Sequence, residues 1–190
     1  MTRRLSPALS LRHQLQIVAI PLVLMSLLEI FNLFSGYRLN QFGIIPRYLP
    51  ALPNIFFSPF LHGSLSHFIS NILPMGILSF LVLQHGLKRY LLVSFIGIFL
   101  TGLLVWLFAR PAMHIGASGL IYCYLGYLVL AGFLSRQLKL ILIAIGVALF
   151  YGGLIWGVLP TRSYVSWESH LFGLIAGLVT AWLFTRIEKS

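Results

Sequence analysis

The sequence predicts an all-α integral membrane protein whose chain crosses the bilayer six times. Of its 190 residues, 59% are hydrophobic and only 8% are charged, whereas a soluble globular domain carries roughly 25% charged residues. The apolar residues fall into six runs, and each approaches the length of about 20 residues that an α-helix needs to cross the hydrocarbon core. Short polar turns separate most of these runs, so we expect residues 1–190 to form a single helical domain.

The limits of the six spans follow from the order of apolar runs and turns. The first run follows Arg12 and has no small-residue cleavage site, which indicates an uncleaved span after a cytoplasmic tail of residues 1–14. Residues 36–59 contain four prolines and several large apolar side chains, and we expect this loop to lie along the outer membrane surface. The predicted spans are Leu15–Ser35, Phe60–Leu83, Tyr90–Phe108, Ala117–Leu134, Leu138–Val158 and Val165–Thr185.

The basic residues predict how the chain is oriented. Loops on the cytoplasmic side of a membrane protein are enriched in lysine and arginine. One side receives nine of them, namely Arg3, Arg4, Arg12, Lys88, Arg89, Arg136, Lys139, Arg186 and Lys189. The other side receives Arg38, Arg47, Arg110 and Arg162. We therefore expect both termini in the cytoplasm. The net charge of +10 favours contacts with anionic lipid over nucleic acid, because the basic residues lie singly or in pairs between apolar runs.

Polar residues within the predicted spans converge on one depth. The second span contains His62, His67 and Asn71, the fourth contains Ser118 and Tyr122, and the sixth contains Ser169 and His170. All lie in the outer third of a helix that begins at the outer face. Polar groups are costly in hydrocarbon and normally face a bundle interior or a water-filled cavity. We therefore expect these three helices to share a wet cavity that opens outward.

The spacing of these residues predicts shared helix faces. His67 and Asn71 are four residues apart, as are Ser118 and Tyr122, and each pair therefore lies on one side of its helix. Gly173 and Gly177 follow His170 with the spacing that lets a neighbouring helix backbone approach closely. Such an approach would bring a histidine of the sixth span to a serine of the fourth.

This combination of residues predicts nucleophilic catalysis. A serine hydroxyl becomes a good nucleophile when a base takes its proton, and His170 is the candidate base for Ser118. The chain has no aspartate, and Glu168 points to another side of the helix from His170, so we expect a Ser–His dyad. Tyr122 could hold the imidazole. The donors for an oxyanion would be the Ser118 amide at a helix N-terminus and the side chains of His67 and Asn71. Gly116 and Gly119 would keep the turn narrow for a substrate backbone.

These motifs resemble those of the rhomboid family of intramembrane serine proteases. The second-helix pattern of two histidines and an asparagine corresponds to His62, His67 and Asn71. The Gly-x-Ser-Gly motif corresponds to residues 116–119, with Tyr122 four residues after the serine. The last-helix histidine with closely spaced glycines corresponds to His170, Gly173 and Gly177. The resemblance covers practically the whole chain.

The resemblance implies a six-helix rhomboid-like bundle in a bacterial inner membrane, which cleaves membrane proteins in or beside their transmembrane segments. Ser118 would attack, His170 would be the base, and His67 and Asn71 would bind the oxyanion. No metal or cofactor is implied, and the partners would be transmembrane substrates and lipids. Two departures concern loop anchoring and substrate preference. Residues 53–60 read PNIFFSPF where many members have a Trp-Arg pair, and Gln84 and His85 stand where an acid is common.

Three other functions are compatible with part of this pattern. A non-catalytic rhomboid-like chaperone or pseudoprotease would bind transmembrane helices without turnover. A metalloprotease or metal transporter would use His62, His67 and His170, but the spacing of the first two suits a single helix face poorly and no HExxH motif is present. A small-solute transporter would show paired repeats with broken helices, which the sequence lacks. His13, His85 and His114 are expected to be solvated or interfacial, and Glu29 has no evident partner.

Overall fold

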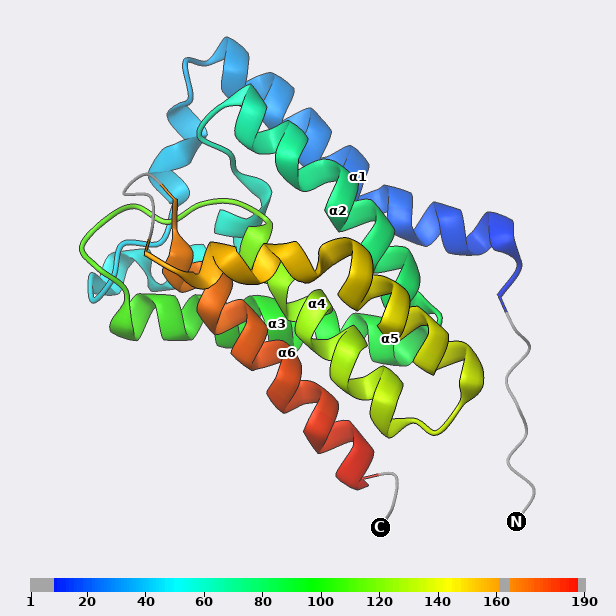
Figure 1. The fold of residues 1–190 in the computed structure, drawn as a ribbon. Coiled ribbons are helices and arrows are strands. Elements are labelled where there is room, and N and C mark those ends of the chain that lie inside the picture. Colours follow the sequence, from blue (N-terminus) through cyan, green and yellow to red (C-terminus); the bar gives the residue numbers. More distant parts are fainter. Residues whose placement is uncertain (1–8, 161–164, 188–190) are drawn as a thin grey trace.

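The computed structural model describes residues 9–160 and 165–187 as a bundle of six α-helices (Figure 1). The expectations for Arg3, Arg4, Arg162 and Lys189 concern positions outside these ranges. Four short 3-10 helices complete the described part: η1 (Arg38–Phe42), η2 (Leu49–Phe56), η3 (Ser58–Phe60) and η4 (Gly152–Val158). The α-helices are α1 (Leu11–Phe34), α2 (Leu65–Leu83), α3 (Leu87–Phe108), α4 (Ser118–Leu134), α5 (Leu138–Tyr151) and α6 (Trp167–Ile187). The predicted fold class is confirmed.

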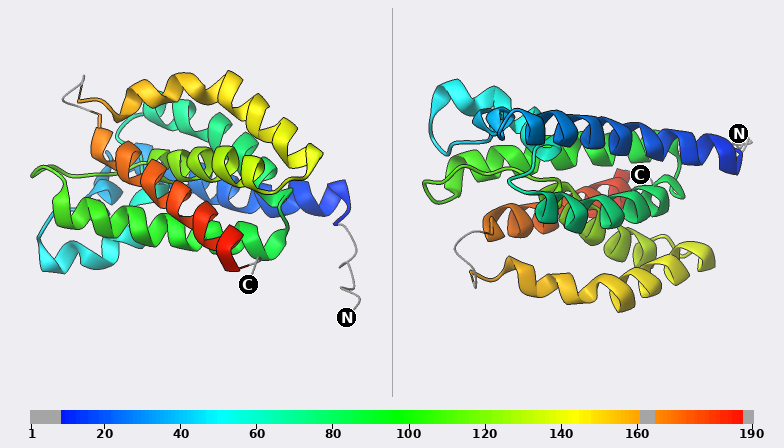
Figure 2. Two further views of the ribbon diagram at one scale, coloured as in Figure 1. Left: turned by 60° about the horizontal axis from the view of Figure 1, so that its bottom comes forward. Right: turned by 90° about the horizontal axis from the view of Figure 1, so that it is seen from above.

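Within the part of the chain that the structure describes, five segments are long and apolar enough to cross a membrane, with α5 and η4 together forming one of them, Leu138–Val158. Helix α4 is the short exception at 17 residues, and most of it is buried among the other helices (Figure 2). The beginning of α1, the end of α6 and the turns α2–α3 and α4–α5 lie toward one end of the bundle, as expected for an even number of antiparallel helices (Figure 2).

The prediction that the second span begins at Phe60 is wrong. Helix α2 begins at Leu65, because the side chain of Ser64 accepts a hydrogen bond from the His67 N–H at 3.2 Å and caps the first turn. Phe60 belongs to η3 instead. His62 therefore lies before the helix and not within a span. The α-helical part of the fifth span is also shorter than expected, since it changes to 3-10 geometry at Gly152.

Glycines bring the α4 and α6 backbones together. A Cβ atom on Gly173 would overlap the carbonyl oxygen of Gly119, and one on Gly177 would overlap the carbonyl oxygen of Cys123. A Cβ on Gly126 would come within 2.7 Å of the Leu174 carbonyl oxygen. The two helices are thus in backbone contact over residues 119–127 of α4 and 173–178 of α6, which is a spacing that only glycine permits at these positions.

Residues 36–59 pack onto the end of α3 rather than extending freely. The Arg47 backbone N–H donates to the Trp106 carbonyl at 2.9 Å, and its guanidinium donates to the Ala109 carbonyl at 2.8 Å. The Trp106 indole donates in return to the Tyr48 carbonyl at 3.0 Å. Ile55 of η2 is buried against Gly102 of α3. These contacts place the proline-rich segment beside the helix end from which the chain continues toward α4.

Candidate active site

The five polar residues expected to do the chemistry line one cavity of about 850 Å³. It lies between α2, α4, α6 and η4, and the segment that precedes α4 forms another part of its wall. Ser118 and His170 are only half-buried, so the cavity connects them to the outside of the protein. The lining side chains include His67, Asn71, Ser118, Tyr122 and His170.

Ser118 is the first residue of α4. The first four N–H groups of a helix have no partner within it, and the helix dipole makes this end attractive for negative charge. Gly116, two residues before Ser118, has a φ of +118°, a backbone conformation that residues with a side chain rarely adopt. Its N–H donates to the Ser58 carbonyl at 2.9 Å. A Cβ on Gly116 would come within 2.7 Å of the His67 ring, so the turn lies directly against that histidine.

His170 is held in a defined orientation on the first turns of α6. Its ring stacks on Tyr122 with centroids 4.2 Å apart and an interplanar angle of 5°. Its Nδ1 is 2.8 Å from the Gly157 carbonyl oxygen. A carbonyl oxygen can only accept, so Nδ1 must carry the hydrogen, and Nε2 of the neutral ring is left with its lone pair. This is the tautomer that a general base needs at Nε2.

The 3-10 helix η4 contributes two backbone acceptors that the sequence did not indicate. Besides the Gly157 carbonyl, the Leu154 carbonyl accepts a hydrogen bond from the Tyr122 hydroxyl at 2.6 Å. A Cβ on Gly157 would overlap that hydroxyl oxygen and come within 3.1 Å of His170 Nδ1. In the sequence, the feature that could have indicated a break in the fifth span here is the set of three glycines Gly152, Gly153 and Gly157.

The α2 residues form the opposite wall. The amide nitrogen of Asn71 donates to the His67 carbonyl at 2.8 Å, while its Oδ1 is buried without a hydrogen-bond partner among the described residues. His62 is fully buried, and its ring meets the His67 ring edge-on with centroids 5.1 Å apart. Both ring nitrogens of His62 lack a partner within the described part of the chain. His62 therefore supports His67 by packing.

Two expectations about histidines are wrong. His114 is 2% exposed and hydrogen-bonded on both ring nitrogens. Both ring nitrogens of His85 are buried, and the ring packs edge-on against Tyr127. Residue type and position along the chain do not reveal these contacts, since His85 packs on a residue of α4 and His114 bonds to Ile44 and Ser166. Burial lowers the pKa of His114 from its ordinary value, which favours the neutral form of the ring.

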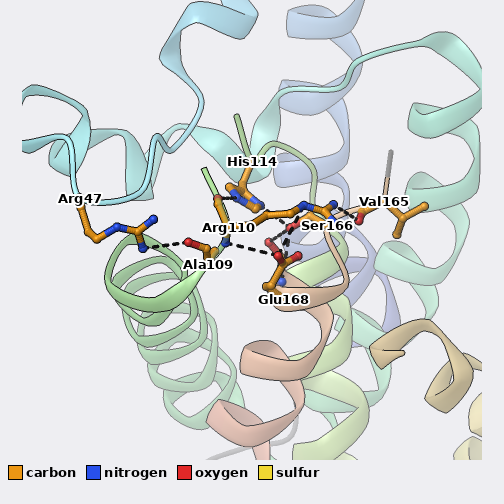
Figure 3. Close-up of polar contacts among 8 residues, drawn as sticks. Arg47, Ala109, Arg110, His114, Val165, Ser166 and Glu168 are labelled. Atoms are coloured by element: carbon orange, nitrogen blue, oxygen red, sulfur yellow. Dashed lines mark hydrogen bonds and ion pairs between the residues drawn. The ribbon is translucent and has the colours of Figure 1, made fainter. Parts of the chain in front are cut away.

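The two carboxylates in the described part of the chain, Glu29 and Glu168, do not line the cavity. Glu168 is buried and pairs with Arg110, whose Nε lies 3.5 Å from Glu168 Oε1 (Figure 3). Glu29 is buried in α1, and its carboxylate has no hydrogen-bond partner among residues 9–160 and 165–187. In the same ranges, no three His, Cys, Asp or Glu residues gather closely enough to hold a metal ion.

Long apolar helices around a polar cavity define a multi-pass helical membrane protein. Residues 51–187 match the Rhomboid domain, and the chain therefore belongs to the rhomboid family. The chain is 36% identical over 176 residues to the uncharacterized protein Rv1337 of Mycobacterium tuberculosis (strain ATCC 25618 / H37Rv), a match that covers 88% of this chain and 73% of that protein. It is 32% identical over 178 residues to the uncharacterized protein ML1171 of Mycobacterium leprae (strain TN), covering 89% and 70% of the two chains.

Proposed function

We propose that the protein is an intramembrane serine protease that cleaves peptide bonds of membrane proteins in or beside their transmembrane segments. Ser118 is the nucleophile and His170 is the general base. One observation carries the proposal: the His170 Nδ1–H is committed to the Gly157 carbonyl. Its unprotonated Nε2 is therefore available within the cavity that Ser118 also lines.

The reaction proceeds through an acyl-enzyme. Ser118 Oγ attacks the scissile carbonyl carbon while its proton passes to His170 Nε2. The tetrahedral intermediate collapses when His170 returns this proton to the leaving amine, and the C–N bond breaks. Water from the outward-open cavity then attacks the ester, with His170 again as base. The proton then returns to Ser118 Oγ as the carboxylic acid leaves.

The oxyanion is stabilised by donors from two helices. The Ser118 N–H lies at the positive end of α4, and the side chains of His67 and Asn71 face the same cavity. Each such donor contributes roughly 3 kcal/mol to transition-state stabilisation. The Asn71 amide nitrogen donates to the His67 carbonyl at 2.8 Å and lies 3.4 Å from Ser70 Oγ, so one of its N–H groups must exchange a partner within α2 for the oxyanion.

Backbone carbonyls take the place of the missing acid. In a serine triad, a carboxylate accepts the Nδ1–H of the histidine and fixes its tautomer. Here the Gly157 carbonyl accepts it, and the stacked Tyr122 ring limits rotation of the imidazole. A neutral acceptor stabilises an imidazolium less than a carboxylate does, but it leaves no uncompensated buried charge in the membrane.

The orientation places the reaction near the outer face. We assign both termini to the cytoplasm, together with residues 1–14, because the basic residues accumulate at that end. The cavity then opens to the extracytoplasmic side, where residues 36–59 form the surface loop. Transmembrane substrates and anionic lipids are the expected partners, and nucleic acid is not.

A fluorophosphonate probe tests the function without knowledge of the substrate. An activated serine displaces fluoride and forms an Oγ–phosphorus bond. We expect the wild-type protein in detergent or bilayers to acquire one adduct, mapped to Ser118 by peptide mass spectrometry. The Ser118→Ala variant should acquire none. Absence of an adduct on Ser118 of the folded wild type would instead support a non-catalytic rhomboid-like protein that binds transmembrane helices.

Gly157→Ala should reduce activity strongly, although position 157 carries no side chain that reacts. The added methyl group overlaps the Tyr122 hydroxyl and crowds His170 Nδ1, so both rings must move. A displacement of about 1 Å in a catalytic group can reduce the rate about 100-fold. We expect the rate of Ser118 labelling to fall between about 10- and 100-fold.

Gly153→Ala is the matched control on the same 3-10 helix. A Cβ at this position meets nothing within 4 Å, so the labelling rate should stay within about twofold of wild type. Equal labelling rates for the two variants would contradict the positioning role of the η4 carbonyls.

A further inference from the structure

His114 lies four residues before Ser118, in the segment that joins α3 to α4. The proposed mechanism does not use it, yet it is 2% exposed and lines the wall of the cavity. Its backbone pairs with Ile44 through two hydrogen bonds of 2.9 and 3.0 Å. Its ring makes two more, to the Ser166 hydroxyl at 2.6 Å and to the Arg110 carbonyl at 3.1 Å.

The direction of each hydrogen bond can be assigned. The Arg110 carbonyl only accepts, so His114 Nε2 carries the hydrogen and Nδ1 of the neutral ring accepts from the Ser166 hydroxyl. That hydrogen of Ser166 is then committed. The Ser169 hydroxyl, 2.6 Å away, must therefore donate to Ser166 Oγ. The result is a relay with a single direction, from Ser169 through Ser166 and His114 to the Arg110 backbone.

A second connection runs parallel to this relay. The Arg110 guanidinium donates to the Val165 carbonyl at 2.6 Å. Its Nε lies 3.5 Å from Glu168 Oε1, and its backbone N–H lies 3.4 Å from the same oxygen. Figure 3 shows that both sets of contacts join the segment of Arg110 and His114 to the residues at the beginning of α6.

The elements joined in this way carry the two reacting groups. The segment with His114 continues directly into Ser118. Ser166 directly precedes α6, and Ser169, in its first turn, is followed directly by His170. Nucleophile and base thus come from separate helices, and their separation depends on how these two helix ends are held. A catalytic pair needs its geometry maintained to within about 0.5 Å. Directional hydrogen bonds provide this better than apolar packing does.

We propose that His114 is a positioning residue, which sets the distance and angle between Ser118 and His170 by linking the segment before α4 to the first turn of α6. This inference rests on the proposed protease function. In this role His114 touches neither the substrate nor the reacting atoms, and it acts through Ser166 and Ser169.

The test compares four variants with the wild type for kcat and KM on a transmembrane substrate and for the unfolding temperature. They are His114→Ala, His114→Asn, Ser166→Ala and the double variant His114→Ala/Ser166→Ala. We expect His114→Ala to lower kcat between about 10- and 100-fold, with KM changed less than about threefold. His114→Asn keeps an acceptor near the position of Nδ1 and should recover kcat to within about fivefold of wild type, since one hydrogen bond is worth about 1 kcal/mol.

The double variant separates the relay from independent effects. Because either substitution interrupts the same relay, its kcat should equal that of the more impaired single variant and not the product of the two losses. His13→Ala, a change of an exposed histidine in α1, is the control and should leave kcat unchanged.

The outcomes distinguish the two proposals. A folded wild type without turnover would overturn the protease function and this inference with it. If the wild type is active, three results would overturn the inference alone. They are full activity of His114→Ala, losses that multiply in the double variant, and impairment of His114→Asn equal to that of His114→Ala. Where His114→Ala unfolds at the assay temperature, recovery in His114→Asn and the loss in Ser166→Ala decide the question.

Discussion

Ser118→Ala and His170→Ala are each expected to abolish cleavage of a designed single-span substrate in bilayers. Removing the nucleophile prevents formation of the acyl-enzyme, and removing the base leaves the Ser118 hydroxyl protonated. Members of a catalytic pair act as one unit, so each single variant should lose about 10³-fold or more and the double variant should lose little further. The measurement is the initial rate of product formation, followed by gel electrophoresis and mass spectrometry of both fragments.

Two further variants make this experiment specific. Tyr122→Phe keeps a ring that can stack on His170 but removes the hydrogen bond to the Leu154 carbonyl, so it should lose much less than His170→Ala. Ser26→Ala removes a hydroxyl that bonds only within α1 and should retain the wild-type rate. Turnover by Ser118→Ala equal to that of the wild type would reject the assignment of the nucleophile.

Gly173→Ala is expected to produce the second large effect, on stability and activity together. The added methyl group would overlap the Gly119 carbonyl oxygen. Because this is backbone next to Ser118, no side-chain rotation can relieve the overlap. Inserting a methyl group into a close-packed contact costs about 1–3 kcal/mol, and α6 must move away from α4. We expect a lower unfolding temperature and a loss of kcat/KM of about 100-fold.

Gly146→Ala is the matched control for this prediction. Gly146 also lies within an apolar helix, but a Cβ there meets nothing within 4 Å. Alanine has a better helix propensity than glycine by about 1 kcal/mol, so this variant should be as active as the wild type and at least as stable. Gly173→Ala that behaved like Gly146→Ala would show that the α4–α6 backbone contact does not limit activity.

The family and the order of helices could be predicted because the bilayer restricts what a spanning segment can contain. Apolar runs must satisfy their backbone groups as helices, and a polar residue within them needs a specific reason to be there. His67, Asn71, Ser118, Tyr122 and His170 therefore stand out in the sequence, and all five line one cavity in the structure. Regular spacing also indicated Gly173 and Gly177 as points of close approach.

The hydrogen-bond partners of Tyr122, His170 and His114 could not be predicted from the sequence, because they are backbone atoms or lie across turns. Every residue has a backbone carbonyl, so residue type does not mark those of Gly157 and Leu154 as acceptors. Their positions depend on the change from α to 3-10 geometry at the end of α5. His114 lies in a short turn, and its burial depends on the packing of residues 36–59 and of α6. The helix start at Leu65 depends similarly on the Ser64 cap.

By itself, the sequence indicated which side chains could react and which of them share a helix face, because hydropathy and helical period act locally along the chain. Only the tertiary structure decided which ring nitrogen of His170 meets the Gly157 carbonyl, which carbonyl accepts from Tyr122, and what links the segment before α4 to the residues that begin α6. These properties depend on hydrogen bonds between residues far apart in sequence, such as His114 with Ser166 and His170 with Gly157. A hydrogen bond requires correct distance and direction within a few tenths of an ångström, and the packing of several helices together sets that geometry.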